Sequence, residues 1–117
     1  MNEIIMTGRI TTDLTTNYVG KGNDTTCVLT FNIAIPDRTA KKDNDGNYPT
    51  DYFRVVAFSG LAEILEKYAG KGDKILIKGK LKNNNYEKDG QKVYGNEIVL
   101  SEVEFLENKK DKKTSKK

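Results

Sequence analysis

Residues 25–35 carry the pattern that most limits how this chain can fold. Leu29, Phe31, Ile33 and Ile35 fall at every second position, and the positions between them are mostly polar or small. Side chains on a β-strand alternate between two faces, so this spacing predicts a strand with one face in a hydrophobic core and the other turned outward. We therefore expect a fold built on half-buried strands.

The rest of the chain divides into further strands, turns and one segment of helical spacing. Ser59 is predicted as the N-cap of a helix that ends at Gly70. Asp89-Gly90 predicts a tight hairpin turn, because both central positions of that turn need positive φ angles, and it sets Glu87 opposite Lys92. The predicted strands are residues 2–10 continued by 15–19, 25–35, 52–58, 73–82 extended by 83–87, and 92–106, and the apolar helix positions are Leu61, Ile64, Leu65 and Tyr68.

This order of elements predicts the fold class. Five strands with the one helix between the third and the fourth is the order of an OB-fold, an all-β, five-stranded Greek-key barrel. At 117 residues the chain has room for a single domain. We expect that domain to span residues 1–107, with a long mobile loop or hairpin tip at 36–49 and a disordered basic tail at 108–117.

The net charge of +3 arises in the tail and not in the predicted barrel. The tail holds six lysines and one aspartate, so residues 1–107 carry 14 basic and 16 acidic side chains and a net charge of −2. Any nucleic-acid site on the barrel must therefore come from a local arrangement of cations and aromatic rings.

The composition argues against catalysis and metal binding. The chain has no histidine, the commonest general base, and its one cysteine, Cys27, is expected to be a half-buried strand residue. Residues 41–52 loosely resemble a calcium loop, but Lys41 and Tyr52 stand where carboxylates are required. The glycines around Lys21 and Lys71 lack the spacing of a phosphate loop. We expect no enzyme activity, no metal and no cofactor.

The apolar segments are too short for a membrane protein. None approaches the roughly 20 residues that a spanning helix needs, and the N-terminus lacks the basic region of a signal peptide. We therefore expect a cytoplasmic protein without a membrane partner.

The predicted strand at 52–58 presents a face suited to nucleic acid. Tyr52, Arg54, Val56 and Phe58 share this face, while the alternate positions are all apolar. Aromatic rings can stack on bases, and a guanidinium between them can hold a phosphate. The alternative interpretation is that Tyr52 and Phe58 only cap the core at the strand ends.

A row of lysines follows on the strand at 73–82. Such a row either tracks phosphates, if the strand lies near 52–58, or is a solvated face that keeps the strand soluble. Tyr86 and Tyr94 on the next hairpin either extend the aromatic platform or, for Tyr86, make an ordinary cross-strand contact with Val93. The outward positions are Lys74, Leu76, Lys78, Lys80 and Lys82, and the core-side positions are Ile75, Ile77, Gly79 and Leu81.

Taken together, these segments resemble the bacterial single-stranded DNA-binding proteins. The resemblance covers residues 1 to about 106 and rests on IIMTGRI (4–10) with Asp13, LTFNIA (29–34), YFRVVAF (52–58) leading into LAE (61–63), YAGKG (68–72) and GKL (79–81). It implies an OB-fold, assembled as a homotetramer, around which single-stranded DNA wraps. It also implies a nucleoid-associated protein that protects such DNA during replication, recombination or repair.

The resemblance assigns residues to the DNA site. It places the stacking aromatics on Tyr52, Phe58 and Tyr86, with Arg54 and the lysine row among the backbone contacts. An aromatic that the family often has early in the long loop falls near Arg38, and an arginine can also stack on a base or hold a phosphate. The predicted DNA-binding residues are Arg9, Arg38, Tyr52, Arg54, Phe58, Lys71, Lys78, Lys80, Lys82 and Tyr86.

The end of the chain departs from the family. Family members typically continue to an acidic tip that recruits replication and repair enzymes, whereas this chain stops at Lys116-Lys117. We therefore do not expect recruitment by that route, and we expect the tail to add a salt-sensitive attraction to DNA. An abridged protein of this kind suits a phage, a plasmid or another mobile element, or a shortened chain.

Three alternative functions remain open at this point. An OB-fold primosome or RNA-binding module would prefer structured or RNA substrates. An OB-fold nuclease would need a carboxylate cluster for a metal, and the acidic residues show no such spacing. A protein-interaction module would leave the lysine row and the aromatic face unexplained.

Overall fold

A computed structural model describes residues 1–83, 85–93 and 95–107 of the chain. The predicted roles of Tyr94 and of the tail at 108–117 lie outside these residues. The elements in chain order are β1 (Ile4–Ile10), β2 (Asn17–Val19), a 3-10 helix η1 (Gly22–Asp24), β3 (Thr26–Pro36), β4 (Thr50–Phe58), α1 (Ser59–Tyr68), β5 (Lys74–Asn83), β6 (Tyr86–Lys88), β7 (Gln91–Val93) and β8 (Asn96–Glu107).

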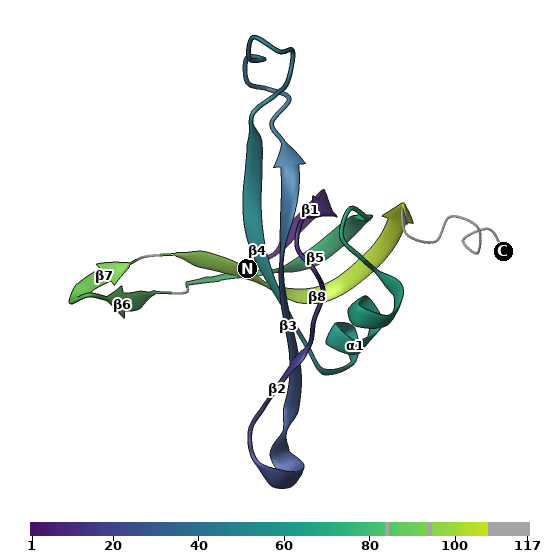
Figure 1. Ribbon diagram of the computed structural model, residues 1–117, viewed down its shortest axis with the longest axis vertical. Coiled ribbons are helices and arrows are strands. Elements are labelled where there is room, and N and C mark those ends of the chain that lie inside the picture. The colour runs from purple at the N-terminus through teal and green to yellow at the C-terminus, as the bar shows by residue number, and fades with distance from the viewer. Residues whose placement is uncertain (84, 94, 108–117) are drawn as a thin grey trace, which may run out of the picture.

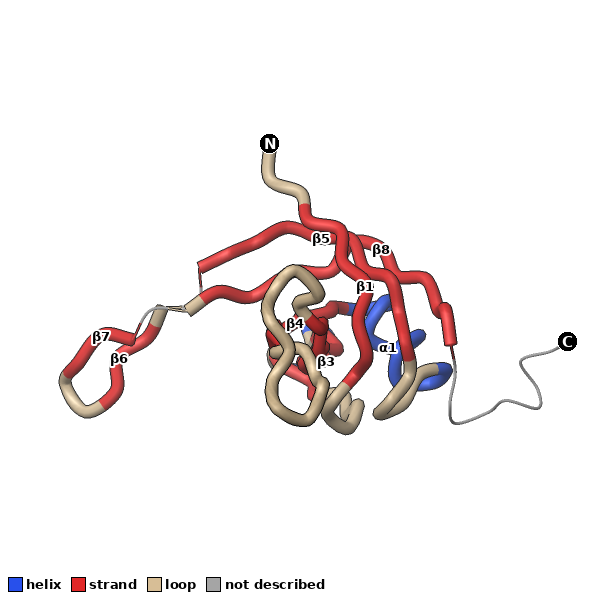
Figure 2. The backbone as a smooth tube through the Cα atoms, turned by 90° about the horizontal axis from the view of Figure 1, so that it is seen from above, coloured by secondary structure: helices blue, strands red, loops and turns tan. Residues whose placement is uncertain are grey.

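The five long strands close into a barrel (Figures 1 and 2). They are ordered β1-β5-β8-β4-β3, and β1 completes the circle by pairing with β3 at Arg9–Ala34 and Ile10–Ile33. Strands β4 and β8 run parallel, and the other barrel pairs are antiparallel. Within the described part of the chain α1 is the one α-helix, between the third and fourth barrel strands. The predicted OB-fold is confirmed.

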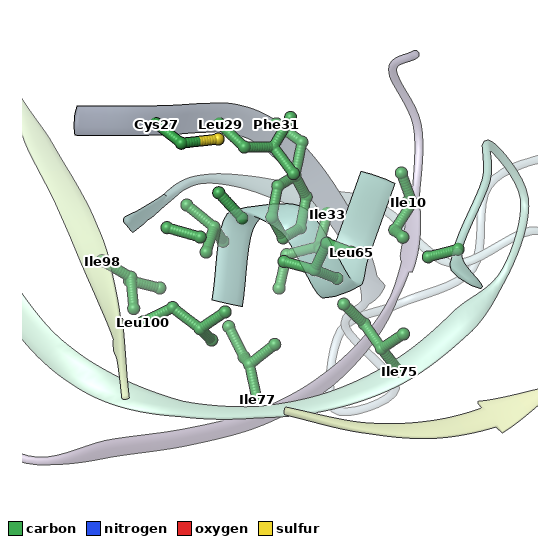
Figure 3. Packing of buried hydrophobic residues seen from close by; sticks show 14 residues of the cluster. Ile10, Cys27, Leu29, Phe31, Ile33, Leu65, Ile75, Ile77, Ile98 and Leu100 are labelled. Carbon is green, nitrogen blue, oxygen red and sulfur yellow. The ribbon is translucent and has the colours of Figure 1, made fainter. Parts of the chain in front are cut away.

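The apolar side chains at alternate positions of β3, which the sequence predicted to face the core, fill the interior of the barrel. Figure 3 shows these side chains pointing toward Leu65 of α1, together with side chains from β1, β5 and β8. Complete burial of each large apolar side chain contributes about 1.5–3 kcal/mol, so this cluster is the main source of stability. The labelled members are Ile10, Cys27, Leu29, Phe31, Ile33, Leu65, Ile75, Ile77, Ile98 and Leu100. Cys27 is therefore buried, where half-burial was expected.

The helix differs from its prediction at its N-terminus, whereas Gly70 directly follows the C-cap residue, Ala69, as expected. Phe58 is the N-cap, without a side-chain hydrogen bond, and Ser59 is the first helical residue with a φ of 55°. The predicted Ser59 cap is therefore wrong, because Ser59 makes the sharp turn out of β4. The helix ends at Tyr68, and the Gly70 N–H donates to the buried carboxylate of Asp73 over 2.8 Å.

The buried face of the helix is also narrower than its periodicity suggests. Ala62 and Leu65 are buried, whereas Ile64 and Tyr68 are exposed. The helix contacts β3, β4 and β8, and this contact covers one narrow stripe of its surface.

Hairpins extend from the barrel in several directions (Figure 1). Strands β3 and β4 stay paired up to Pro36–Thr50, so residues 37–49 form a hairpin tip. In this tip the Asp43 carboxylate accepts hydrogen bonds from the backbone N–H groups of Asp45 and Asn47, each 2.9 Å long. Of the two alternatives predicted for residues 36–49, a long loop or a hairpin tip, the structure therefore shows the hairpin tip.

The second hairpin, between β5 and β8, confirms one prediction and corrects another. Asp89 and Gly90 both have positive φ angles, 53° and 80°, and Glu87 is paired with Lys92 as expected. Leu81, however, was predicted on the core side and is 40% exposed. Strand β5 has run past the barrel at this point, so no opposite layer covers Leu81.

Gly79 lies at a bulge, where the register of β5 against β8 shifts between Lys78 and Gly79. A Cβ at this position would collide with the backbone oxygen of Val99 and lie 3.0 Å from Cγ2 of Ile98. The close approach of the two backbones therefore requires glycine.

Gly79→Ala is expected to lower the free energy of unfolding by about 1–3 kcal/mol, because β8 must move to admit the methyl group. Urea unfolding followed by circular dichroism measures this loss. The control is Gly60→Ala in the first turn of α1, where no atom lies within 4 Å of the new Cβ and no loss is expected. Equal unfolding free energies for the two variants would contradict the role assigned to the bulge.

Candidate nucleic-acid interface

The outer face of β4 carries the predicted aromatic platform. Tyr52 is 64% exposed and Phe58 is 43% exposed, while the alternate residues Val55 and Ala57 are buried in the core. This exposure argues against the alternative in which the two rings only cap the core. Arg54 lies between the rings on the same face and is also exposed.

The pairing register places this platform on a surface that spans four strands. Val56 of β4 is paired with Thr30 of β3 and with Val99 of β8, and Val99 is paired in turn with Lys80 of β5. Adjacent strands lie about 4.8 Å apart, so Lys80 is about 10 Å from β4. The lysine strand is therefore not the direct neighbour of the platform, because β8 lies between them.

A carboxylate on β8 separates two of the predicted cations. Glu97 is paired with Lys82 across the β5–β8 ladder, and its Oε1 lies 3.7 Å from Nε of Arg54. The sequence interpretation missed Glu97, because its position between β4 and β5 depends on the barrel closure and on the bulge. The available indication was its place on the strand that pairs with the lysine row.

Two other predicted cations are also held by carboxylates. Nζ of Lys78 lies 3.1 Å from Glu3, and the Arg9 guanidinium donates to Glu107 over 2.6 Å and to the Gly72 carbonyl over 3.0 Å. Lys78 lies beyond the bulge and is paired with Ile5 of β1, so it belongs to a different part of the surface from Lys80.

The remaining predicted residues are spread over the molecule. Tyr86 is 53% exposed and is paired with Val93 in the separate two-stranded sheet of β6 and β7. Lys71 is exposed in the turn before β5, at the opposite end of that strand from Lys82. Arg38 follows β3 and lines a pocket together with Arg9. The structure thus groups Tyr52, Arg54, Phe58, Lys80 and Lys82 on one surface and sets the others apart.

The described residues contain no group of three or more histidine, cysteine, aspartate or glutamate side chains that could hold a metal ion. None of the helices described is long and apolar enough to cross a membrane.

The chain matches a known family over nearly its whole length. Residues 1–106 match the family described as the single-strand binding protein family. The chain belongs to this family. Among curated relatives, it is 38% identical to the single-stranded DNA-binding protein of Clostridium tetani, covering 92% of this chain and 71% of that protein. It is 35% identical to the one from Thermotoga maritima, covering 92% and 75%.

A solved structure shares the fold. The Plasmodium falciparum SSB in a complex with ssDNA superposes with a TM-score of 0.75 at 24% identity, covering 92% of this chain and 96% of that one. This chain and the Plasmodium falciparum protein therefore have the same fold.

The Lys78 pair offers a test of the ion-pair geometry. The hydrogen bond that the Lys78 ammonium donates to Glu3, with the charges of Glu3 and Glu102, raises the pKa of Lys78, while desolvation opposes the rise. Glu3→Gln should therefore lower the pKa of Lys78 toward the ordinary lysine value. A Cε NMR titration measures this pKa.

The raised pKa also fixes the direction of the pH dependence. While Glu3 is a carboxylate, the pair stabilises the fold at pH values below the ordinary lysine pKa of about 10.4, and this contribution is lost as the pH rises through the raised pKa of Lys78 in the folded state. Glu63→Gln on α1 is the control and should leave the pKa of Lys78 unchanged. An unchanged pKa in Glu3→Gln would show that the pair does not persist in solution.

Proposed function

We propose that this chain binds single-stranded DNA by base stacking and phosphate neutralisation, without preference for base sequence and without catalysis. The observation that carries the proposal is the exposed face of β4, where Tyr52 and Phe58 flank Arg54. Stacking of a base on an aromatic ring is worth about 1–3 kcal/mol and is possible for every base. Duplex DNA has its bases already stacked and hidden, so it is a poorer ligand.

The phosphates are neutralised by cations around this platform. Lys80 and Lys82 are exposed on the same surface, two strands from β4. Tyr86 adds a ring on the projecting hairpin. The proposed contacts further from the platform are Arg9, Arg38, Lys71 and Lys78.

We extend the proposal to the organisation of the protein. Residues 1–107 are the DNA-binding domain, and the basic residues after Asn108 add attraction to DNA. We propose a homotetramer, which is supported by the first half of β1: residues 4–8 pair with β5 and, within the described chain, with no second strand. A cytoplasmic, nucleoid-associated role in replication, recombination or repair follows from binding unpaired DNA, which these processes expose.

The direct test is fluorescence anisotropy of labelled oligo-dT and of a matched duplex at two salt concentrations. We expect tight, salt-dependent binding to the single strand and much weaker binding to the duplex. Tyr52→Ala should weaken single-strand binding about 5- to 150-fold with little change in the salt slope, because it removes a stacking contact and no charge. Lys80→Ala should reduce the slope by up to about 0.7.

The matched control for Tyr52 is Tyr68→Ala, which removes another exposed ring from α1. This variant should bind like the unaltered protein. Equal affinity for single strand and duplex, or equal losses in the two tyrosine variants, would mean that charge alone drives binding and would refute the platform.

Glu97 gives an opposite prediction, a gain of binding. Because its carboxylate competes with phosphate for Arg54 and faces Lys82, Glu97→Gln should tighten binding to oligo-dT and steepen the salt slope by up to about 0.7 for each cation that gains a phosphate. Anisotropy titrations in a salt series measure both quantities. The control Glu63→Gln removes the same charge from the helix, and an equal gain in that variant would contradict the competition.

A further inference from the structure

The first residues of the chain contact β5 at the point where that strand leaves the barrel. The backbone pairing of β1 with β5 ends at Ile4–Gly79. Beyond this pair the Asn2 side chain supplies the contact: its Nδ2 donates to the Leu81 carbonyl over 2.8 Å, and its Oδ1 accepts from the Leu81 N–H over 3.0 Å. These two hydrogen bonds are called the Asn2 bridge.

The bridge continues the β1–β5 ladder with a side chain in place of a backbone. Leu81 follows Gly79 by two residues, which is the spacing at which an antiparallel ladder repeats the same kind of pair. An asparagine amide carries both a donor and an acceptor, so Asn2 exchanges two bonds with Leu81 as a backbone partner does. Leu81 is thereby held on its β1 side as well as on its β8 side, where it is paired with Ile98.

The surroundings of β5 change at the same point. Its burial alternates up to Gly79, whereas residues 80–83 are all exposed. This end of β5 is paired with β8, as at Lys82–Glu97, and leads into the β6–β7 hairpin (Figure 1). Because the core does not cover the exposed end of β5, its position depends on hydrogen bonds to its two neighbours.

A second contact attaches the same N-terminal segment to β5. Oε2 of Glu3 lies 3.1 Å from Nζ of Lys78. Residues 2 and 3 are therefore each joined to β5, and the ion pair of one keeps the amide of the other close to Leu81.

We propose that Asn2 is a positioning residue for DNA binding. Lys80 and Lys82 precede and follow Leu81 and share the outward face, so fixing Leu81 fixes the backbone that carries both lysines. A strand end that is ordered before DNA arrives loses less entropy when its side chains engage phosphates. This inference rests on the proposed binding of single-stranded DNA, and Asn2 itself does not contact the DNA.

The alternative is that the bridge only stabilises the fold. A stabilising contact changes the free energy of unfolding, but it does not change the number of phosphates that the folded protein neutralises. A positioning contact does change this number, so replacing the uncharged Asn2 should alter the salt dependence of DNA binding. The salt slope therefore distinguishes the two roles.

The experiment uses the full chain and measures anisotropy of labelled oligo-dT in a salt series. Asn2→Ala removes the bridge and is made alone, together with Lys80→Ala and Lys82→Ala, and together with Tyr52→Ala. The control is Asn44→Ala, because Asn44 is an exposed asparagine of the β3–β4 hairpin tip whose side chain forms no hydrogen bond within the described residues.

We expect Asn2→Ala to weaken binding roughly two- to tenfold and to reduce the salt slope by up to about 0.7 for each lysine that loses its phosphate. Both effects should disappear when the two lysines are already replaced, and they should persist in full beside Tyr52→Ala, since non-additivity marks residues that act together. Asn44→Ala should bind like the unaltered protein.

Hydrogen exchange of the DNA-free protein tests the bridge without reference to DNA. Asn2→Ala should speed exchange of the Leu81 amide roughly two- to tenfold and leave the amide of the buried Ile77 unchanged. An unchanged Ile77 amide also shows that the variant is folded. An unchanged Leu81 amide would refute the bridge.

The outcomes separate the two proposals. If the unaltered protein does not bind oligo-dT, the proposed function itself fails. If it binds, and Asn2→Ala matches Asn44→Ala or loses equally with and without the two lysines, only the positioning role is refuted. A loss of affinity with an unchanged salt slope would likewise assign Asn2 to stability alone.

Discussion

Closure of the barrel by β1 is the constraint on which the rest of the surface depends. This strand leaves β5 and joins β3 at Arg9 and Ile10, and the crossing brings the backbones so close that a Cβ on Gly8 would lie 2.9 Å from the Ala34 oxygen. The closed circle fixes the neighbours of every outward side chain. The row from Tyr52 through Ala34 to Arg9 exists only because these strands meet.

Local patterns were sufficient to predict the elements of the barrel. The alternation around Phe31 and Val55 determines which face of β3 and of β4 is buried, because period-two burial is a property of one strand and its nearest layer. Asp89-Gly90 predicts its hairpin equally well, since a tight turn depends on its own backbone angles. The exposed rings of Tyr52 and Tyr86 follow from the same local rules.

What the sequence could not supply is the set of contacts between segments far apart in the chain. Leu81 follows the alternation of β5 but lies where that strand has left the barrel. The placement of β8 between the lysine strand and β4 depends on strand order, which periodicity does not contain. The same holds for Glu97 beside Arg54 and for the pocket that joins Arg9, Arg38 and Lys74.

The position of Glu97 affects how a bound strand would move. In the proposed complex, the Glu97 carboxylate, whose Oε1 lies 3.7 Å from Nε of Arg54, would replace a phosphate that leaves this cation. Detachment at Arg54 would then exchange one anion for another. A DNA strand held in this way would be released one phosphate at a time. The protein would then slide along the strand, and an enzyme advancing on the same strand would displace it readily.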